Sequence, residues 1–209
     1  MPGSRESSFP LFRCGRKELD YLRKKDKKLG LAIDRIGPLE REIIPDLFTA
    51  LIRNIVAQQI SKEAMVTIWE RMKERFGDIT PARFGPLPPE EIQSCGMSMR
   101  KAEYICGVSR AAAEGTLDLG ALQDLPDEEV IERLSSLRGV GRWTAEMLLI
   151  FSMKRPDVLS YGDLATRRGI MTLYGHKTLD RERFDRYRKR YSPCGSTASL
   201  YLWEISAEG

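Results

Sequence analysis

The pattern of apolar and polar residues along this 209-residue chain predicts helices joined by short turns. Apolar residues recur at helical spacing between Pro45 and Phe76. The segment 142–151 is apolar on most of its faces, so we expect that helix to be buried. No stretch alternates apolar and polar residues for long enough to predict a strand. The pattern therefore predicts an all-α fold.

The other expected helices are shorter or more polar, and glycine, proline and N-capping residues mark their ends. Gly30 is expected to end the first of them, and Ser98 is placed to cap another. Their approximate ranges are 16–29, 90–94, 98–115, 128–136, 164–174, 180–191 and 197–205. The single histidine, His176, follows a glycine in a turn and is expected at the surface.

A tight turn over Leu137–Gly141 joins the helix at 128–136 to the buried helix that follows. Its two glycines permit positive φ and leave the backbone bare. The amides at the start of the second helix, with the positive end of its dipole, could then bind an anion. Arg138 and Arg142 flank the turn and suit a phosphate. Taken alone, the turn could equally be an ordinary helix–helix connection.

The longer motif is more specific. Residues 137–145 read LRGVGRWTA, an apolar helix follows, and Asp163 comes twenty residues after Trp143. This resembles the helix-hairpin-helix DNA glycosylases, whose hairpin reads LPGVGxxTA and whose catalytic aspartate follows the second helix. Members that also cut the DNA strand carry a lysine at the position of Trp143. The 3-methyladenine DNA glycosylase II branch carries tryptophan there, as this chain does.

The resemblance implies two helical lobes. An inner lobe would span 46–152 and include the hairpin at about 128–151. An outer lobe would combine 1–45 with 153–209, and a cleft between the lobes would hold the site. Asp163 would be the catalytic carboxylate in that cleft. The base pocket would be lined by Trp143, Met147, Tyr161 and Leu164.

The resemblance also implies a set of DNA contacts. The segment IVAQQIS, 55–61, resembles the element that enters the duplex and fills the gap left by an extruded base. By itself, Gln58-Gln59 is also a reasonable helix-boundary pair. Residues 95–105 resemble the GLSxxKAxYL element of the family. The expected DNA-binding residues are Gln58, Gln59, Ser98, Lys101, Arg138, Gly139, Val140, Gly141, Arg142 and Thr144.

The resemblance implies one possible cofactor, a monovalent cation, Na⁺ or K⁺, bound by hairpin carbonyls at about Ser135, Leu137 and Val140. An iron–sulfur cluster, which some relatives hold with four cysteines near the C-terminus, is not expected, because only Cys194 lies there. The scattered cysteines also argue against zinc and disulfides and favour a reducing cytoplasm. No signal peptide or membrane-spanning run is apparent.

Charge is unevenly distributed along the chain. Residues 1–28 hold nine Lys/Arg against four Asp/Glu, and residues 154–190 hold eleven against five. Residues 29–153 are acidic, with fourteen Lys/Arg against nineteen Asp/Glu. Basic runs are usually solvated faces, yet two basic flanks around a phosphate-binding hairpin also suit a nucleic-acid backbone.

These features together predict a monomeric, monofunctional DNA glycosylase that acts on double-stranded DNA containing a damaged base. N-alkylated purines such as 3-methyladenine are the expected substrates, because the indole of Trp143 offers a cation–π surface to a cationic base. Excision of oxidised guanine, deaminated purines or uracil is the enzymatic alternative. A non-catalytic helix-hairpin-helix DNA-binding module is the alternative of another class. Relatives often carry PWRS or PYRS where this chain has Pro193–Ser196, which implies a wider pocket.

Overall fold

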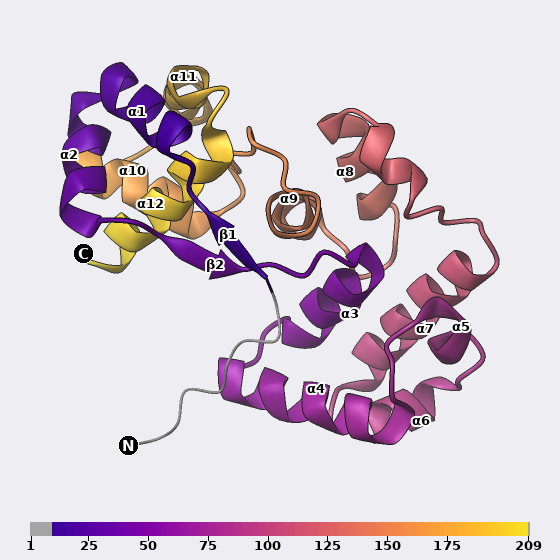
Figure 1. Ribbon diagram of the computed structural model, residues 1–209. Coiled ribbons are helices and arrows are strands. Elements are labelled where there is room, and N and C mark those ends of the chain that lie inside the picture. Colours follow the sequence, from indigo (N-terminus) through magenta and orange to yellow (C-terminus); the bar gives the residue numbers. More distant parts are fainter. Residues whose placement is uncertain (1–9, 209) are drawn as a thin grey trace. The chain divides into compact units, whose positions relative to one another are not determined.

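The structure, a computed structural model, describes residues 10–208 and is predominantly helical, as the sequence pattern predicts (Figure 1). The chain divides into two compact units. One unit takes the described residues up to Ile43 together with those from Leu149 onward, and the other runs from Ile44 to Leu148. Within the described residues, no helix is long and apolar enough to cross a membrane.

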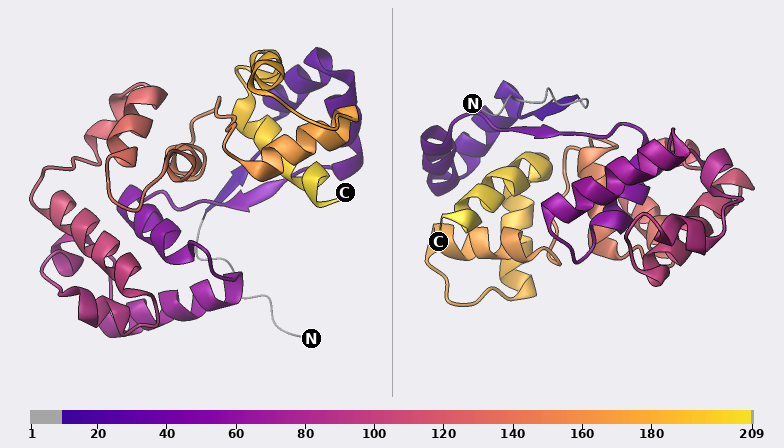
Figure 2. Two further views of the ribbon diagram at one scale, coloured as in Figure 1. Left: turned by 180° about the vertical axis from the view of Figure 1, so that it is seen from behind. Right: turned by 90° about the horizontal axis from the view of Figure 1, so that it is seen from below.

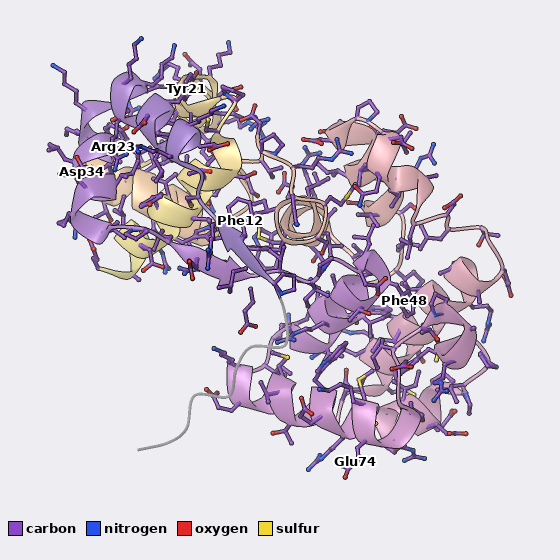
Figure 3. The ribbon with its side chains drawn as sticks, in the orientation of Figure 1. Phe12, Tyr21, Arg23, Asp34, Phe48 and Glu74 are labelled. Atoms are coloured by element: carbon purple, nitrogen blue, oxygen red, sulfur yellow. The ribbon has the colours of Figure 1, made fainter. Side chains whose placement is uncertain are left out.

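The unit from Ile44 to Leu148 is built from helices packed on a shared apolar core. Phe48 on α3 is almost fully buried, whereas Glu74 on α4 points to the surface (Figure 3). Burial of such apolar side chains is the main favourable term in folding. The elements are α3 (Leu47–Ala57), α4 (Lys62–Phe76), α5 (Pro81–Phe84), α6 (Pro89–Gln93), α7 (Met99–Ala113), a 3₁₀ helix (Ala121–Asp124), α8 (Asp127–Ser135) and the start of α9 (Arg142–Phe151).

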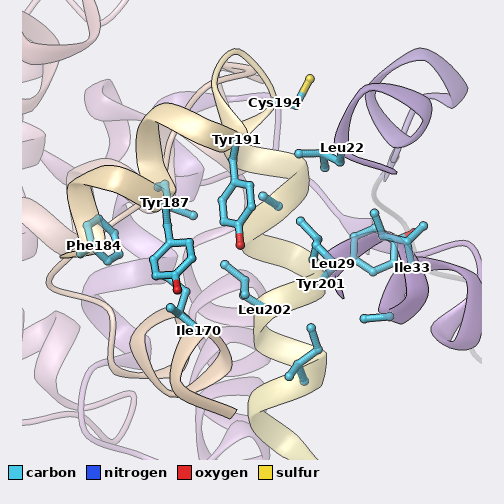
Figure 4. Packing of buried hydrophobic residues seen from close by; sticks show 14 of the residues in the cluster. Leu22, Leu29, Ile33, Ile170, Phe184, Tyr187, Tyr191, Cys194, Tyr201 and Leu202 are labelled. Carbon is cyan, nitrogen blue, oxygen red and sulfur yellow. The ribbon is translucent and has the colours of Figure 1, made fainter. Parts of the chain in front are cut away.

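The second unit joins the two ends of the described chain. Helices α10 and α12 lie side by side (Figure 2), so closely that a Cβ on Gly169 would meet the backbone of Leu202 at 2.1 Å. Tyr191 and Tyr201 lie fully buried in its core (Figure 4). Its elements are β1 (Leu11–Arg13), α1 (Arg16–Lys25), α2 (Lys27–Ile36), β2 (Glu40–Glu42), α10 (Leu164–Tyr174), α11 (Arg181–Tyr191) and α12 (Gly195–Ala207).

Many helices begin at a residue whose side chain accepts a hydrogen bond from the first turn. Such caps satisfy amides that have no partner within the helix. Ser98 caps α7, as the sequence predicts, by accepting from the backbone amide of Lys101. Side-chain caps of this kind are formed by Asp26, Asp46, Ser61, Thr80, Ser98, Asp163 and Asp180.

Three local expectations need correction. The helix expected over 16–29 breaks at Asp26, whose side chain caps a second helix that continues through Gly30 to Ile36. Arg23 of α1 then pairs with Asp34 of α2 at 2.8 Å (Figure 3). Residues 10–208 also contain one antiparallel pair of three-residue strands, β1 and β2, which are too short to show alternation. His176 is half-buried, with Nε2 at 2.7 Å from the Tyr187 hydroxyl.

Candidate functional site

The turn between α8 and α9 is a compact hairpin (Figure 1). Gly139 has φ of +86°, a left-handed conformation that side-chain-bearing residues rarely adopt. The amide of Val140 donates to the carbonyl of Leu137 at 3.1 Å, and the amide of Ala145 donates to the carbonyl of Gly141 at 3.0 Å. Val140 is buried, so its side chain anchors the turn.

The two hairpin glycines, Gly139 and Gly141, differ in how much space surrounds them. A Cβ on Gly139 would lie 2.1 Å from the ring of Tyr104, on α7, so no side chain fits there. A Cβ on Gly141 would meet nothing within 4 Å, and Gly141 does not have positive φ. Packing therefore demands glycine at 139 but not at 141. No local sequence pattern indicates Tyr104 as a partner of the hairpin.

The two arginines that flank the turn also differ. Arg138 is exposed and lies over the ring of Tyr104, 5.9 Å from its centroid. Arg142 forms a two-pronged ion pair with Glu128, at 2.6 and 2.8 Å, and a further contact with Glu146 at 3.2 Å. The hydrogen bonds to Glu128 raise the pKa of Arg142 further. Arg142, expected at a phosphate, thus pairs with two carboxylates, whereas Arg138 lies against the Tyr104 ring.

A groove of about 600 Å³ lies beside the hairpin in the unit 44–148. It brings together six of the expected site residues: Gln58, Gln59, Ser98, Lys101, Trp143 and Thr144. Trp143 is 47% exposed although the rest of α9 is largely buried. Trp143 is therefore not a fully buried core residue.

The loop after α3 is tied to the hairpin. Gln58 Nε2 donates to the carbonyl oxygen of Gly139 at 2.7 Å, across 81 residues of sequence. The next residue, Gln59, is exposed and has φ of +56°. The side chain of Gln58 thus joins the loop to the hairpin, whereas the side chain of Gln59 is exposed at the groove.

The ammonium of Lys101, expected at a DNA phosphate, donates to the carbonyl of Val56 at 2.8 Å. It therefore satisfies a carbonyl in the last turn of α3, where a cation is also favoured by the helix dipole. Burial lowers the pKa of Lys101. Ser98 and Arg100 are exposed on the same wall of the groove.

Asp163 lies at the start of α10 and is 6% exposed. One of its oxygens, Oδ1, accepts from the backbone amide of Thr166 at 2.8 Å. The residue is therefore held in place by the helix that it begins. Of its expected companions, Leu164 is 59% exposed and Tyr161 packs edge-on against Phe184 at 5.1 Å. Met147 is buried within α9.

The loop before α12 explains the departure from the usual PWRS or PYRS. The amide of Gly195 donates to Asp157 Oδ1 at 3.0 Å, and Ser192 Oγ donates to Asp157 Oδ2 at 2.6 Å. A Cβ on Gly195 would lie 2.7 Å from Asp157 Oδ1. Cys194 is buried in the core beside it. A larger residue at 195 therefore has no room while Asp157 keeps this position.

A family model described as HhH-GPD superfamily base excision DNA repair protein matches residues 52–193. The chain belongs to this family. It is 31% identical to a putative DNA-3-methyladenine glycosylase from Bacillus subtilis over 75% of this chain, and it spans 58% of that relative's length.

Two solved structures are similar to the chain as a whole. The DNA-3-methyladenine glycosidase from Bacillus halodurans has a TM-score of 0.83 and 33% identity, with 94% of this chain and 92% of that chain covered. The 3-methyladenine DNA glycosylase of Schizosaccharomyces pombe, in complex with abasic DNA, has a TM-score of 0.75 and 28% identity, with 90% and 95% covered. These similarities extend beyond the hairpin to both units of the fold.

Proposed function

We propose that this protein is a monofunctional DNA glycosylase that releases N-alkylated purines, 3-methyladenine among them, from double-stranded DNA. The observation that carries the proposal is Trp143, a residue that is 47% exposed and lines a groove beside the hairpin. An exposed, electron-rich ring favours a cationic alkylated base over its neutral counterpart. The names of the B. halodurans and S. pombe relatives support the same substrate class.

The reaction requires the damaged nucleotide to leave the base stack, since the glycosidic bond is out of reach inside a duplex. As that bond breaks, positive charge develops on the sugar. We assign Asp163 to stabilise this charge and to orient or deprotonate the attacking water. Its carboxylate is held by the Thr166 amide, so it needs little reorganisation when the charge appears. An N-alkylated purine is already cationic and leaves without further protonation.

The hairpin would hold DNA mainly through the sugar–phosphate backbone. Such contacts do not depend on the base sequence. Gly141 leaves open space for this approach, and Arg138 supplies an exposed cation. The hairpin carbonyls of Ser135, Leu137 and Val140 would hold a monovalent cation that bridges to a phosphate. The Leu137 carbonyl accepts one hydrogen bond, from Val140, and a carbonyl oxygen has a second lone pair for such a ligand. We propose that the protein acts as a monomer.

The deciding experiment incubates the protein with duplexes that each carry one modified base and identifies the released bases. Release of 3-methyladenine or 7-methylguanine, with an intact abasic strand as the other product, is expected. Release confined to oxidised guanine, deaminated purines or uracil would redirect the assignment to another substrate class. Tight duplex binding without release of any base would identify a non-catalytic DNA-binding module.

A further inference from the structure

Asp163 begins α10, and α12 lies alongside that helix (Figure 2). We propose that Trp203, on α12, is a positioning residue for Asp163 and acts through Thr166. Its indole N–H fixes the first turn of α10, and the backbone amide in that turn holds the carboxylate. The inference rests on the proposed function, because it concerns how the carboxylate assigned to the sugar cation is kept in place.

The first argument is a chain of two hydrogen bonds. The indole Nε1 of Trp203 donates to Thr166 Oγ1 at 3.0 Å, and the amide of Thr166 donates to Asp163 Oδ1 at 2.8 Å. Thr166 is fully buried, so bulk water does not reach its hydroxyl. Loss of the indole N–H would therefore take a donor from a buried hydroxyl that water cannot replace. The residue that holds Asp163 is thus itself held by Trp203.

The second argument is that the indole has little freedom to leave this position. Its other contact is Phe151, the last residue of α9, whose ring stacks on it with centroids 5.8 Å apart and planes at 29°. An indole has a single hydrogen-bond donor, and the bond to Thr166 uses it. Trp203 is therefore fixed by a ring contact and by a directional bond at the same time.

The third argument is the face of α12 from which Trp203 comes. Ser196 and Ser199 precede it at helical spacing, so all three side chains lie on one side of α12. Ser196 Oγ accepts from the Val158 amide, and Ser199 Oγ donates to the Val158 carbonyl, both at 3.0 Å. One face of α12 thus holds the backbone on both sides of Asp163, with the serines before it and Trp203 after it.

The fourth argument is the close packing of the two helices. A Cβ on Gly169 would lie 2.1 Å from the carbonyl oxygen of Leu202, the neighbour of Trp203. The helices cannot move closer together to make up for a lost side-chain contact. A carboxylate stabilises a developing charge best when it is already in position, and a misplacement of about 1 Å can cost about 10²-fold in rate. Small shifts at the start of α10 should therefore appear in catalysis.

The test compares variants that remove one hydrogen-bonding atom and keep the shape. Trp203→Phe removes the indole N–H and keeps a ring on Phe151, whereas Thr166→Val removes the hydroxyl and keeps the amide. Thr166→Ser restores the hydroxyl, and the double variant carries Trp203→Phe with Thr166→Val. Trp69→Phe, at a buried tryptophan on α4, is the matched control.

Each variant is measured in two ways. Single-turnover release of 7-methylguanine at increasing protein concentration separates the maximal rate from the half-saturating concentration. Hydrogen exchange of the backbone amide at position 166, followed by NMR, reports the bond to Asp163 without any reaction. Melting temperatures show that the variants are folded under the assay conditions.

We expect Trp203→Phe and Thr166→Val each to lower the maximal rate about tenfold or more and to speed exchange at position 166 by a similar factor. The half-saturating concentration should stay within about twofold of wild type, as should every measurement on Trp69→Phe and Thr166→Ser. Because the two residues act through one bond, the double variant should be no slower than the slower single variant.

Three results would overturn the proposal: an unchanged maximal rate in Trp203→Phe, rate losses that multiply in the double variant, or a slower rate with unchanged exchange at position 166. If Trp203→Phe does not fold, the comparison of Thr166→Val with Thr166→Ser decides in the same way. Equal losses in those two variants would then contradict a role of the hydroxyl.

Failure of the proposed function would look different. The wild-type protein would then release no base from any duplex, and the exchange measurements alone would judge the inference. Faster exchange at position 166 in Trp203→Phe would still show that the indole holds the bond to Asp163. Exchange that matches wild type would overturn the inference whether or not the protein is an enzyme.

Discussion

Asp163 and Thr166 are joined by a hydrogen bond of 2.8 Å from the backbone amide of Thr166 to the Asp163 carboxylate. The side chain assigned to the chemistry therefore also begins α10. An asparagine can make the same cap without the negative charge. This makes it possible to separate the catalytic role of Asp163 from its structural one.

We predict that Asp163→Asn lowers base release by at least about 10²-fold, because the developing sugar cation loses its carboxylate. Duplex binding and melting temperature should stay close to those of wild type, since the cap is kept. Asp163→Ala should in addition lower the free energy of unfolding by about 1 kcal/mol through loss of the cap. Single-turnover assays and thermal melts measure the two effects. Near wild-type release by Asp163→Asn would remove Asp163 from the mechanism.

The two hairpin glycines should respond oppositely to alanine. Gly139→Ala should cost about 2 kcal/mol of stability or more, since the residue has positive φ and its Cβ would meet the Tyr104 ring. Gly141→Ala should change stability by less than about 0.5 kcal/mol, because its Cβ meets nothing within 4 Å. It should nevertheless weaken binding to damaged and undamaged duplexes alike. A loss confined to damaged DNA would contradict a backbone contact.

Trp143→Ala should abolish selective release of cationic purines while lowering the melting temperature only slightly. Trp143 is 47% exposed, so removal of its side chain leaves little cavity. Trp143→Phe, which keeps an aromatic face, serves as the matched variant and should retain part of the activity. Rates of alkylated-base release and melting temperatures, measured for each variant, distinguish a pocket role of Trp143 from a packing role. A large fall in stability with activity per folded molecule unchanged would mean that the ring serves packing.

Reaction in the presence of borohydride should trap no protein–DNA adduct. A lyase needs an amine that forms a Schiff base with the sugar, and Trp143 stands at the position where lyase relatives carry lysine. Among the described residues, Lys101 is the one lysine that lines the groove, and its amine is engaged by the Val56 carbonyl. If an adduct does form, Lys101→Met identifies whether this amine made it. Formation of an adduct would end the monofunctional assignment.

The stability of the protein should fall below about pH 4 through Asp26. Its burial alone would raise the pKa of this carboxyl, but hydrogen bonds from the Leu29 amide, the Tyr174 hydroxyl and Arg190 outweigh burial and lower it. The unfolded chain therefore binds a proton more readily, and the stabilisation is lost as pH falls through the folded pKa. Asp26→Asn should melt lower at pH 7 and lose less between pH 5 and 3 in thermal melts. Parallel curves for the two proteins would contradict this role.

Local features of the fold were predictable from sequence. The cap at Ser98, the glycine hairpin at 137–141 and the buried helix that follows it depend on residues close together in the chain. The break at Asp26 was missed because the lysines on both sides suit one continuous helix. Residues far away in the chain contribute to this break, because Tyr174 and Arg190 both bind the Asp26 carboxylate.

Pairings within the candidate site were harder to foresee. The position of Arg142 beside the turn predicts a phosphate contact, but its ion pairs with Glu128 and Glu146 could not be foreseen from that position. The hydrogen bond from Gln58 to Gly139 joins residues 81 positions apart, and no local sequence pattern predicts a contact between such distant residues. Sequence motifs thus indicated which segments form the candidate site, whereas the side-chain pairings within it became visible only in the structure.

The bond between Gly195 and Asp157 limits how this protein could be redesigned. An arginine transplanted alone into position 195 would collide with the Asp157 carboxylate, which lies 2.7 Å from where its Cβ would be. The same carboxylate also accepts from Ser192, so replacing Asp157 would free the start of α12 as well. Substitutions at positions 157 and 195 are therefore expected to be tolerated only in combination. A library that varies residues 157, 192 and 195 jointly would reach sequences that single substitutions cannot.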